Sequence, residues 1–175
     1  MKLLIISARM SAARRGRAKN NSLQNYLKTS IITSREVNFL IIKYMLGKKI
    51  LIVEDDANLL YGLQAKFRVA GYEVLTDQGA DKAAIMEKIK TLKPGYIILD
   101  IVLPQVDGFE LLSEIKADPA ISMTQVFIFT NLSDTDSRQK GKELGADFYL
   151  IKSELNLDEF VEKFQKIISN KTKVN

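Results

Sequence analysis

From residue 48 onward, the pattern of apolar and polar positions switches repeatedly between that of a buried strand and that of a helix. Five short, mostly apolar runs are typical of strands buried on both faces, at residues 49–54, 72–76, 96–100, 125–130 and 148–151. A segment that we predict as a helix follows each run, at residues 57–70, 80–92, 108–117, 135–144 and 155–168. Gly71, Pro94 and Gly145 stand at or beyond the ends of three of these segments, where glycine and proline commonly end helices.

Five consecutive strand–helix units predict an α/β fold. Parallel neighbouring strands need a crossover connection, and because crossovers are right-handed the helices cover both faces of the sheet. We therefore expect a doubly wound parallel sheet. In such sheets ligands bind outside the carboxyl ends of the strands, so the residues that follow each strand are the candidates for chemistry.

The composition narrows that chemistry. Of the 175 residues, 46% are hydrophobic and 27% charged, which is enough to bury a core. The chain contains no cysteine and no histidine, which excludes disulfides, thiolate nucleophiles, serine–histidine triads and metals held by Cys or His. Carboxylates, hydroxyls, lysines and backbone groups remain. No apolar run approaches the roughly 18 residues that span a bilayer, so we expect a soluble, cytoplasmic protein.

The net charge of +5 combines two unlike parts. Residues 1–49 contain eleven Lys or Arg against one Glu, a net charge of +10, whereas residues 50–175 contain 15 basic against 20 acidic residues, a net charge of −5. We therefore divide the chain into a basic N-terminal extension, residues 1–46, and a domain, residues 47–170. Within the extension we expect a flexible segment and a short helix at 35–46, which Ser34 caps and Gly47 ends.

Three interpretations of the extension stay open. A solvated tail is the one that the composition favours. Contact between the phosphates of a nucleic acid and the basic side chains of Arg14, Arg15, Arg17 and Lys19 is a less favoured alternative. The natural chain could also start at Met45, in which case residues 1–44 would not belong to it.

Four of the five predicted strands end in polar or charged side chains, namely Glu54, Asp55, Asp56, Asp100, Thr130 and Lys152. The carboxylates of Glu54, Asp55 and Asp100 are expected to lie close together, which raises at least one pKa unless a cation neutralises them. An all-oxygen site with few protein ligands suits Mg²⁺. With Lys152 and the Thr130 hydroxyl nearby, Asp100 is equipped to accept a phosphoryl group. The alternative, that these residues only cap helices or lie at the surface, explains each one singly but not their common position.

The stretches ILIVEDDANL, YIILDIVLPQVDGFELL, VFIFTNLSD and GADFYLIKS resemble, in order and spacing, the receiver domain of bacterial two-component response regulators. The resemblance covers residues 48–170 and implies a flavodoxin-like (βα)5 sheet of strand order 2-1-3-4-5. It implies that Asp100 is the phosphoacceptor and that Asp55 binds Mg²⁺, or Mn²⁺, directly. Glu54 would act through water, and Asp100 and the backbone carbonyl of Val102 would complete the ligands.

The same resemblance assigns the remaining residues of the rim. Thr130 would bind the phosphoryl group, Lys152 would neutralise its charge, and Tyr149 matches the family's switch aromatic. Asp56 falls one place beyond the acidic pair, so we expect it to cap the first helix. Pro104 and Gly108 shape the loop that follows the phosphoacceptor.

Three departures from the family pattern limit what the resemblance implies. Ser153 stands where the family usually has a proline in a cis bond, and a cis bond before a residue other than proline costs about 3–4 kcal/mol. Whether the bond between Lys152 and Ser153 is cis or trans is left open, and a trans bond would displace Lys152 slightly. Asn131 replaces a small residue, and Leu132 and Val102 are apolar at positions where the family's side chains influence the access of water.

The resemblance implies a phosphoacceptor signalling protein rather than a classical enzyme, one that catalyses only its own phosphorylation and dephosphorylation. Since only 170–175 follow the last helix, we expect a single-domain response regulator, phosphorylated by a histidine kinase or a phosphotransfer protein. A downstream protein would dock on residues 135–168. A receiver-like scaffold that acts without phosphorylation is the alternative. A flavin-binding protein shares the topology, but the acidic first loop would repel a flavin phosphate.

Overall fold

The computed structural model describes residues 49–171. The predicted extension, with its helix at 35–46, lies outside these described residues. The strands are β1 (Lys49–Val53), β2 (Glu73–Asp77), β3 (Tyr96–Leu99), β4 (Gln125–Thr130) and β5 (Phe148–Ile151). The helices are α4 (Ala57–Val69), α5 (Lys82–Leu92), α6 (Gly108–Ala117), α7 (Thr135–Glu143) and α8 (Leu157–Lys171), with a 3-10 turn, η1, at Lys152–Glu154.

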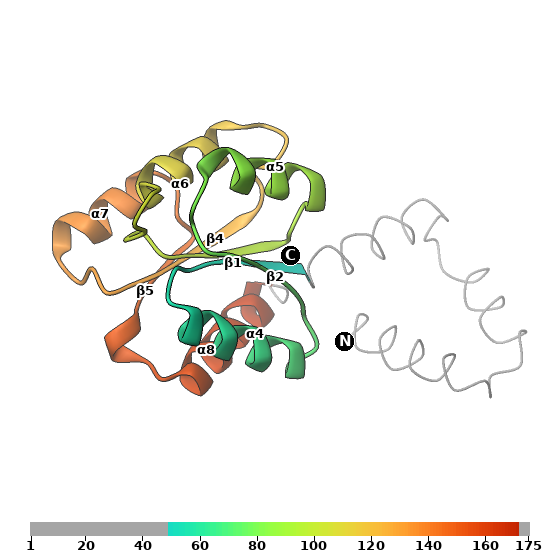
Figure 1. The fold of residues 1–175 in the computed structure, drawn as a ribbon. Helices are drawn as coiled ribbons and strands as arrows, with labels where there is room; N and C mark the ends of the chain where they lie inside the picture. Colours follow the sequence, from blue (N-terminus) through green and yellow to red (C-terminus); the bar gives the residue numbers. More distant parts are fainter. Residues whose placement is uncertain (1–48, 172–175) are drawn as a thin grey trace, which may run out of the picture. The chain divides into compact units, whose positions relative to one another are not determined.

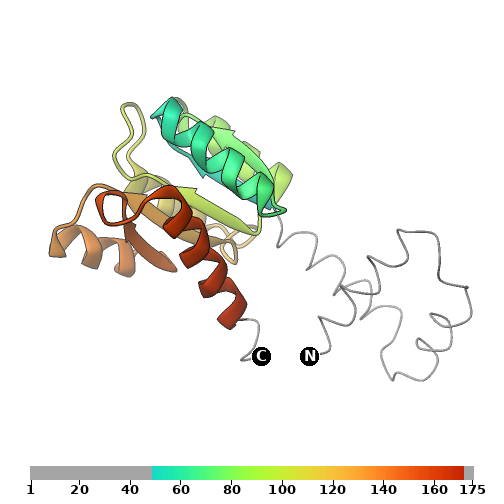
Figure 2. The ribbon, with the colours of Figure 1, turned by 90° about the horizontal axis from the view of Figure 1, so that it is seen from below.

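The five strands form one parallel sheet in the order β2-β1-β3-β4-β5, as the sequence predicted. Helices α5, α6 and α7 cover one face of the sheet and α4 and α8 cover the other (Figure 1). In the view from below, α4 and α8 lie side by side on their face of the sheet (Figure 2). The strand order changes direction between β1 and β3, and this is where a doubly wound sheet opens its ligand crevice.

Successive residues of the strands face opposite sides and build two hydrophobic cores. Leu51, Val53 and Leu99 lie in the core under α5 and α6. Ile50 and Ile52 lie in the other, which includes Phe67 and the aromatic side chains of α8. All of these side chains are fully buried. The two cores pack against the two faces of the sheet, so the side chains at the strand ends extend from a rigid backbone.

Acidic side chains fix where four of the helices begin. The carboxylates of Asp56, Asp81, Asp107 and Asp134 accept hydrogen bonds from backbone amides in the first turns of α4, α5, α6 and α7. The capping role predicted for Asp56 is thus confirmed. Because Asp81 is itself the cap, α5 begins at Lys82 and not at residue 80 as predicted.

Among the other boundaries that differ from the prediction, two do so for similar reasons. The Asn156 side chain accepts hydrogen bonds from the amides of Asp158 and Glu159, so α8 begins at Leu157, two residues later than predicted. The amide of Tyr72 donates to the carbonyl of Phe67 and closes the end of α4, so β2 begins only at Glu73. Both shifts come from hydrogen bonds at the helix ends.

Candidate functional site

The acidic residues that follow β1 and β3 come together because these strands are neighbours in the sheet. Val53 pairs with Leu99, and the Asp100 amide donates to the Val53 carbonyl at 3.0 Å. One carboxylate oxygen from each of Glu54, Asp55 and Asp100 lies within 4.8 Å of the others. Glu54 and Asp100 are 2% and 4% exposed, whereas Asp55 is exposed. The cluster therefore has a buried floor and an open side.

Lys152 enters this cluster from the end of β5 and contacts both buried carboxylates. Its ammonium nitrogen lies 2.5 Å from Asp100 Oδ2 and 2.7 Å from Glu54 Oε2. The lysine side chain is only 12% exposed. Burial alone would lower the pKa of Lys152, but the hydrogen bonds to Asp100 and Glu54 raise it above its ordinary value. Lys152 is thus held as a cation against the two carboxylates.

The pKa of Glu54 is set by opposing effects of burial and of the neighbouring charges. Burial raises its pKa above the ordinary value, and the nearby charge of Asp100 acts in the same direction. The hydrogen bond and the charge of Lys152 oppose that rise without cancelling it. The sequence pattern associates Glu54 with the metal and gives no sign of its ion pair with Lys152. The two residues are 98 positions apart and only the order of the strands brings them together.

The backbone after Asp100 is held tightly. The amide of Val102 donates to Asp100 Oδ1 at 3.0 Å, and Val102 also forms an isolated antiparallel bridge with Asp107. The amide of Gly108 donates to the carbonyl of Ile101 at 3.3 Å and closes the loop. A Cβ atom on Gly108 would lie 2.6 Å from Ile101 Cα and 2.8 Å from the Asp100 carbonyl oxygen. Only glycine allows this close approach to the backbone of residues 100 and 101, and the Val102 amide orients the Asp100 carboxylate.

Thr130 and Tyr149 flank the loop that follows β4. Thr130 is completely buried, and its hydroxyl oxygen accepts a long hydrogen bond of 3.5 Å from the Leu132 amide. The Tyr149 hydroxyl donates to the Leu132 carbonyl at 3.1 Å. Burial, with smaller contributions from nearby acidic side chains, raises the pKa of Tyr149 and keeps its hydroxyl protonated. The structure therefore places both residues against the same segment, residues 131–133.

The bond between Lys152 and Ser153 is trans, as are all the others in the described part of the chain. Ser153 lies in the η1 turn, an element absent from the sequence-based prediction. The lysine nonetheless reaches both Asp100 and Glu54. The replacement of proline by serine therefore does not remove the lysine from the cluster.

The donor set of the cluster fits a divalent cation. It consists of carboxylate oxygens from three residues, and hard divalent cations prefer oxygen ligands. Asp55 offers an exposed carboxylate on the open side. Glu54 and Asp100 already share one positive charge, that of Lys152, so a second cation would complete the neutralisation of three acidic groups.

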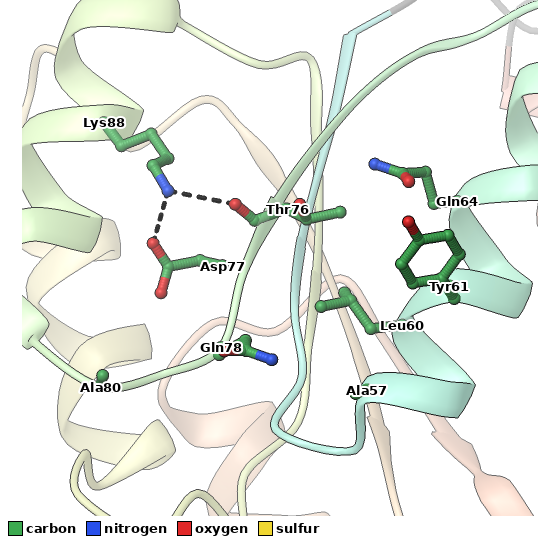
Figure 3. A pocket seen from close by; sticks show the side chains of 9 residues that line it. All are labelled: Ala57, Leu60, Tyr61, Gln64, Thr76, Asp77, Gln78, Ala80 and Lys88. Carbon is green, nitrogen blue, oxygen red and sulfur yellow. Dashed lines mark hydrogen bonds and ion pairs between the residues drawn. The ribbon is translucent and has the colours of Figure 1, made fainter.

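A separate hollow of about 540 Å³ lies beside β2, between α4 and α5 (Figure 3). Its walls include Tyr61 and Gln64 of α4, with Asp77 and Lys88 joined across the other side by an ion pair of 2.6 Å. Lys88 also donates to the carbonyl of Thr76 on the edge strand. None of the carboxylates of the cluster lines this hollow, so we do not assign the chemistry to it.

Comparison with protein families gives one match over most of the described chain. The response regulator receiver domain family matches residues 50–165. The alkaline phosphatase synthesis transcriptional regulatory protein PhoP of Bacillus subtilis is 33% identical over 107 residues, which are 61% of this chain and 43% of that protein. The probable transcriptional regulator ycf27 of Porphyridium aerugineum is 32% identical over 108 residues, 62% of this chain and 43% of the relative. The chain thus spans less than half the length of these curated relatives.

Solved structures agree with this match. The chemotaxis response regulator CheY4 of Vibrio cholerae superposes with a TM-score of 0.62 at 26% identity, covering 69% of this chain and 98% of that one. The Mn²⁺-bound form of response regulator Rcp1 superposes with a TM-score of 0.56 at 29% identity, covering 66% and 88%. In residues 49–171, no helix has both the length and the apolar character needed to cross a membrane.

Proposed function

The chain belongs to the response regulator receiver domain family, and from this premise we propose that it accepts a phosphoryl group on Asp100 with the help of a bound divalent cation. The observation that carries the proposal is the contact between Asp100 and Lys152 inside an acidic cluster. An ion pair alone would need no third carboxylate. Asp55 adds a negative charge that the lysine does not contact, and a divalent cation bound beside it would neutralise this charge.

In the proposed step, a carboxylate oxygen of Asp100 attacks the phosphorus atom of a phosphohistidine. The new O–P bond forms as the P–N bond breaks, and the histidine nitrogen leaves with the bonding electron pair. Lys152 neutralises charge on the phosphoryl oxygens, and the hydroxyl of Thr130 donates a hydrogen bond to one of them. The held backbone around Gly108 keeps the carboxylate oriented for attack, so little orientational freedom is lost in the transition state.

Asp55, Asp100 and the carbonyl of Val102 would hold the cation directly, and Glu54 would act through a water molecule. When bound, the cation would offset charge on the phosphoryl oxygens. We propose Mg²⁺ as the physiological ion, with Mn²⁺ as a substitute. The ion pair between Lys152 and Glu54 supports the indirect role of Glu54, because that carboxylate is already partly neutralised.

The proposed donor is a histidine kinase or a phosphotransfer protein, and the proposed output is a changed surface over residues 135–168. These residues include α7, β5 and most of α8. They contain Lys152 and also Tyr149, whose hydroxyl contacts the loop that follows Thr130. Phosphorylation would shift the population between two packings of this region. A downstream protein would bind one packing better than the other.

The decisive experiment is labelling by a small phosphodonor. Acetyl phosphate or phosphoramidate should add one phosphoryl group when Mg²⁺ is present and none when the metal is chelated. Asp100→Asn should remove the labelling, whereas Asp56→Asn should not, because asparagine also caps helices and Asp56 lies outside the cluster. The bond should be cleaved by hydroxylamine, as expected of an acyl phosphate. Equal labelling of Asp100→Asn and the wild type would refute the site, and no labelling at all would favour a phosphorylation-independent scaffold.

A further inference from the structure

Arg138, on α7, joins the loop that follows Thr130 to the turn that begins with Lys152, the two proposed phosphoryl-binding residues. Its Nε donates to the carbonyl of Ser133 at 3.2 Å, in the loop after β4. Its Nη2 lies 3.3 Å from Glu154 Oε1, in the η1 turn after β5. Ser133 is three residues beyond Thr130, and Glu154 is two residues beyond Lys152. One guanidinium group therefore connects the segments on both sides of the site.

The same guanidinium covers Tyr149. Its central carbon lies 5.7 Å from the centre of the Tyr149 ring, within the range of a cation–π contact. The Tyr149 hydroxyl in turn donates to the carbonyl of Leu132. Residues 132 and 133 are thus held by two neighbouring side chains that also contact each other.

Helix α7 has few other attachments to the domain. Its sequence, TDSRQKGKE, contains no large apolar side chain, and Gly141 is its only buried residue. Gly141 lets the helix approach Ile128 and the Tyr149 ring, since a Cβ there would lie 2.8–2.9 Å from both. The ammonium of Lys140 lies 4.4 Å from the centre of the Phe109 ring. Because burial contributes so little, the polar contacts of Arg138 have a large share in where α7 and its preceding loop lie.

These contacts bear on Thr130 through Leu132. The Leu132 amide donates to the Thr130 hydroxyl at 3.5 Å, a weak bond, so the threonine and the loop are linked only loosely. A movement of the Thr130 side chain towards a phosphoryl group on Asp100 either breaks this bond or draws Leu132 along. Arg138 opposes the second route because it holds the adjacent carbonyl, that of Ser133.

We propose that Arg138 is a positioning residue that ties the loop after β4 to the turn after β5 and restrains the adjustment of Thr130 to a phosphoryl group. The proposal rests on the proposed function of Asp100. Releasing the restraint should make phosphoryl mimics bind more tightly. The two side chains of the ion pair are 41% and 58% exposed, and exposed pairs are weak, so we expect a modest effect of roughly two- to fivefold.

The test measures the affinity of the full chain for beryllofluoride in the presence of Mg²⁺, from the amide chemical shifts of residues 101–103. Arg138→Gln should bind roughly two- to fivefold more tightly than the wild type, and Glu154→Gln should show a smaller gain because the bond to Ser133 survives. Arg138→Lys keeps the charge but loses the fork of donors, and it should fall between the wild type and Arg138→Gln. Asp158→Asn is the matched control. It removes the ion pair between Lys66 and Asp158, which joins α4 to α8 and whose two side chains are 41% and 71% exposed.

Urea unfolding of the same variants separates positioning from stability. A purely structural Arg138 would lower the unfolding midpoint and leave the beryllofluoride affinity unchanged, and that result would overturn the inference. Weaker binding by Arg138→Gln would also overturn it, since the residue would then prepare the site instead of restraining it. If wild type binds no beryllofluoride and takes no label, the proposed function itself has failed. Binding by wild type with equal affinity in all variants refutes only the role of Arg138.

Discussion

Replacing Gly108 by alanine should damage both the stability of the domain and the geometry of its proposed acceptor. The added Cβ would lie 2.6 Å from Ile101 Cα, 2.8 Å from the carbonyl oxygen of Asp100 and 2.9 Å from that of Ile101. Ordinary contacts of a Cβ begin near 3.4 Å. All three neighbours are backbone atoms, so no side chain can rotate to make room.

The expected loss of stability depends on which backbone atoms have to move to make room for the Cβ. The backbone at Ile101 lies between the buried strand β3 and the loop closed by the bridge of Val102 with Asp107, so it cannot shift alone. Overpacking a rigid interior costs about 1–3 kcal/mol, and we expect the upper half of that range here. For a domain of this size, 2 kcal/mol corresponds to a fall in Tm of roughly 6–12 °C. The displaced Asp100 should also be labelled more slowly by acetyl phosphate.

Gly62→Ala provides a matched control. Its Cβ would also lie 2.6 Å from a neighbour, but that neighbour is the end of the Leu157 side chain, which can change rotamer. Gly62 lies inside α4, where alanine gains roughly 0.5–1 kcal/mol in helix propensity. We expect this variant to unfold within about 1 kcal/mol of the wild type and to be labelled normally. Urea unfolding and the initial rate of labelling would check both variants, and similar losses in both would refute the argument.

Three further expectations concern the metal, the switch and pH. Binding of Mn²⁺, followed by electron paramagnetic resonance, should be abolished in Asp55→Ala and only weakened in Glu54→Ala, whose side chain is partly neutralised by an ion pair; equal losses would contradict the direct and indirect roles. With beryllofluoride, hydrogen exchange over residues 135–168 should change in the wild type but not in Lys152→Ala, and an unchanged wild type would mean that the phosphoryl site has no switch. Hydrogen bonds from the first turn of α7 lower the pKa of Asp134 below its ordinary value of 3.8. Because the folded pKa is the lower one, this carboxylate stabilises the fold above pH 3.8 and loses that effect as pH falls through the folded value. The difference in urea midpoint between wild type and Asp134→Asn should therefore be larger at pH 7 than at pH 3, and a constant difference would refute the assignment.

The sequence determined the fold to a large extent. Fully apolar runs such as residues 96–99 are strands buried on both faces, and their alternation with helical segments specifies a parallel sheet. These are local signals, because each strand or helix is encoded by its own residues and by its caps. For the same reason the sequence identified Asp56 as a cap, and Asn156 and Asp81 carry equally local capping signals.

The candidate site was determined by sequence only as a set of residues at one rim of the sheet. The polar residues at the strand ends identified Asp100, Glu54 and Lys152 as candidate site residues, since parallel strands all end on the same side. Which of these side chains touch was not predictable. The ion pair of Lys152 with Glu54 joins the residues that follow β5 and β1, two strands that are not neighbours, so it depends on how the lysine side chain crosses the rim.

Other features appeared only in the tertiary structure. Gly108 looked like a turn residue, but its necessity comes from the backbone of residues 100 and 101 packed against it. Arg138 lies in a helix without large apolar side chains, and nothing in the sequence marked it as important. It nevertheless contacts Ser133, Tyr149 and Glu154, which belong to three different segments. Contacts of this kind depend on distances between elements, which are set by the packing of two cores and not by any local pattern. The sequence therefore determined which chemistry is available, and the packing decided how its groups are held.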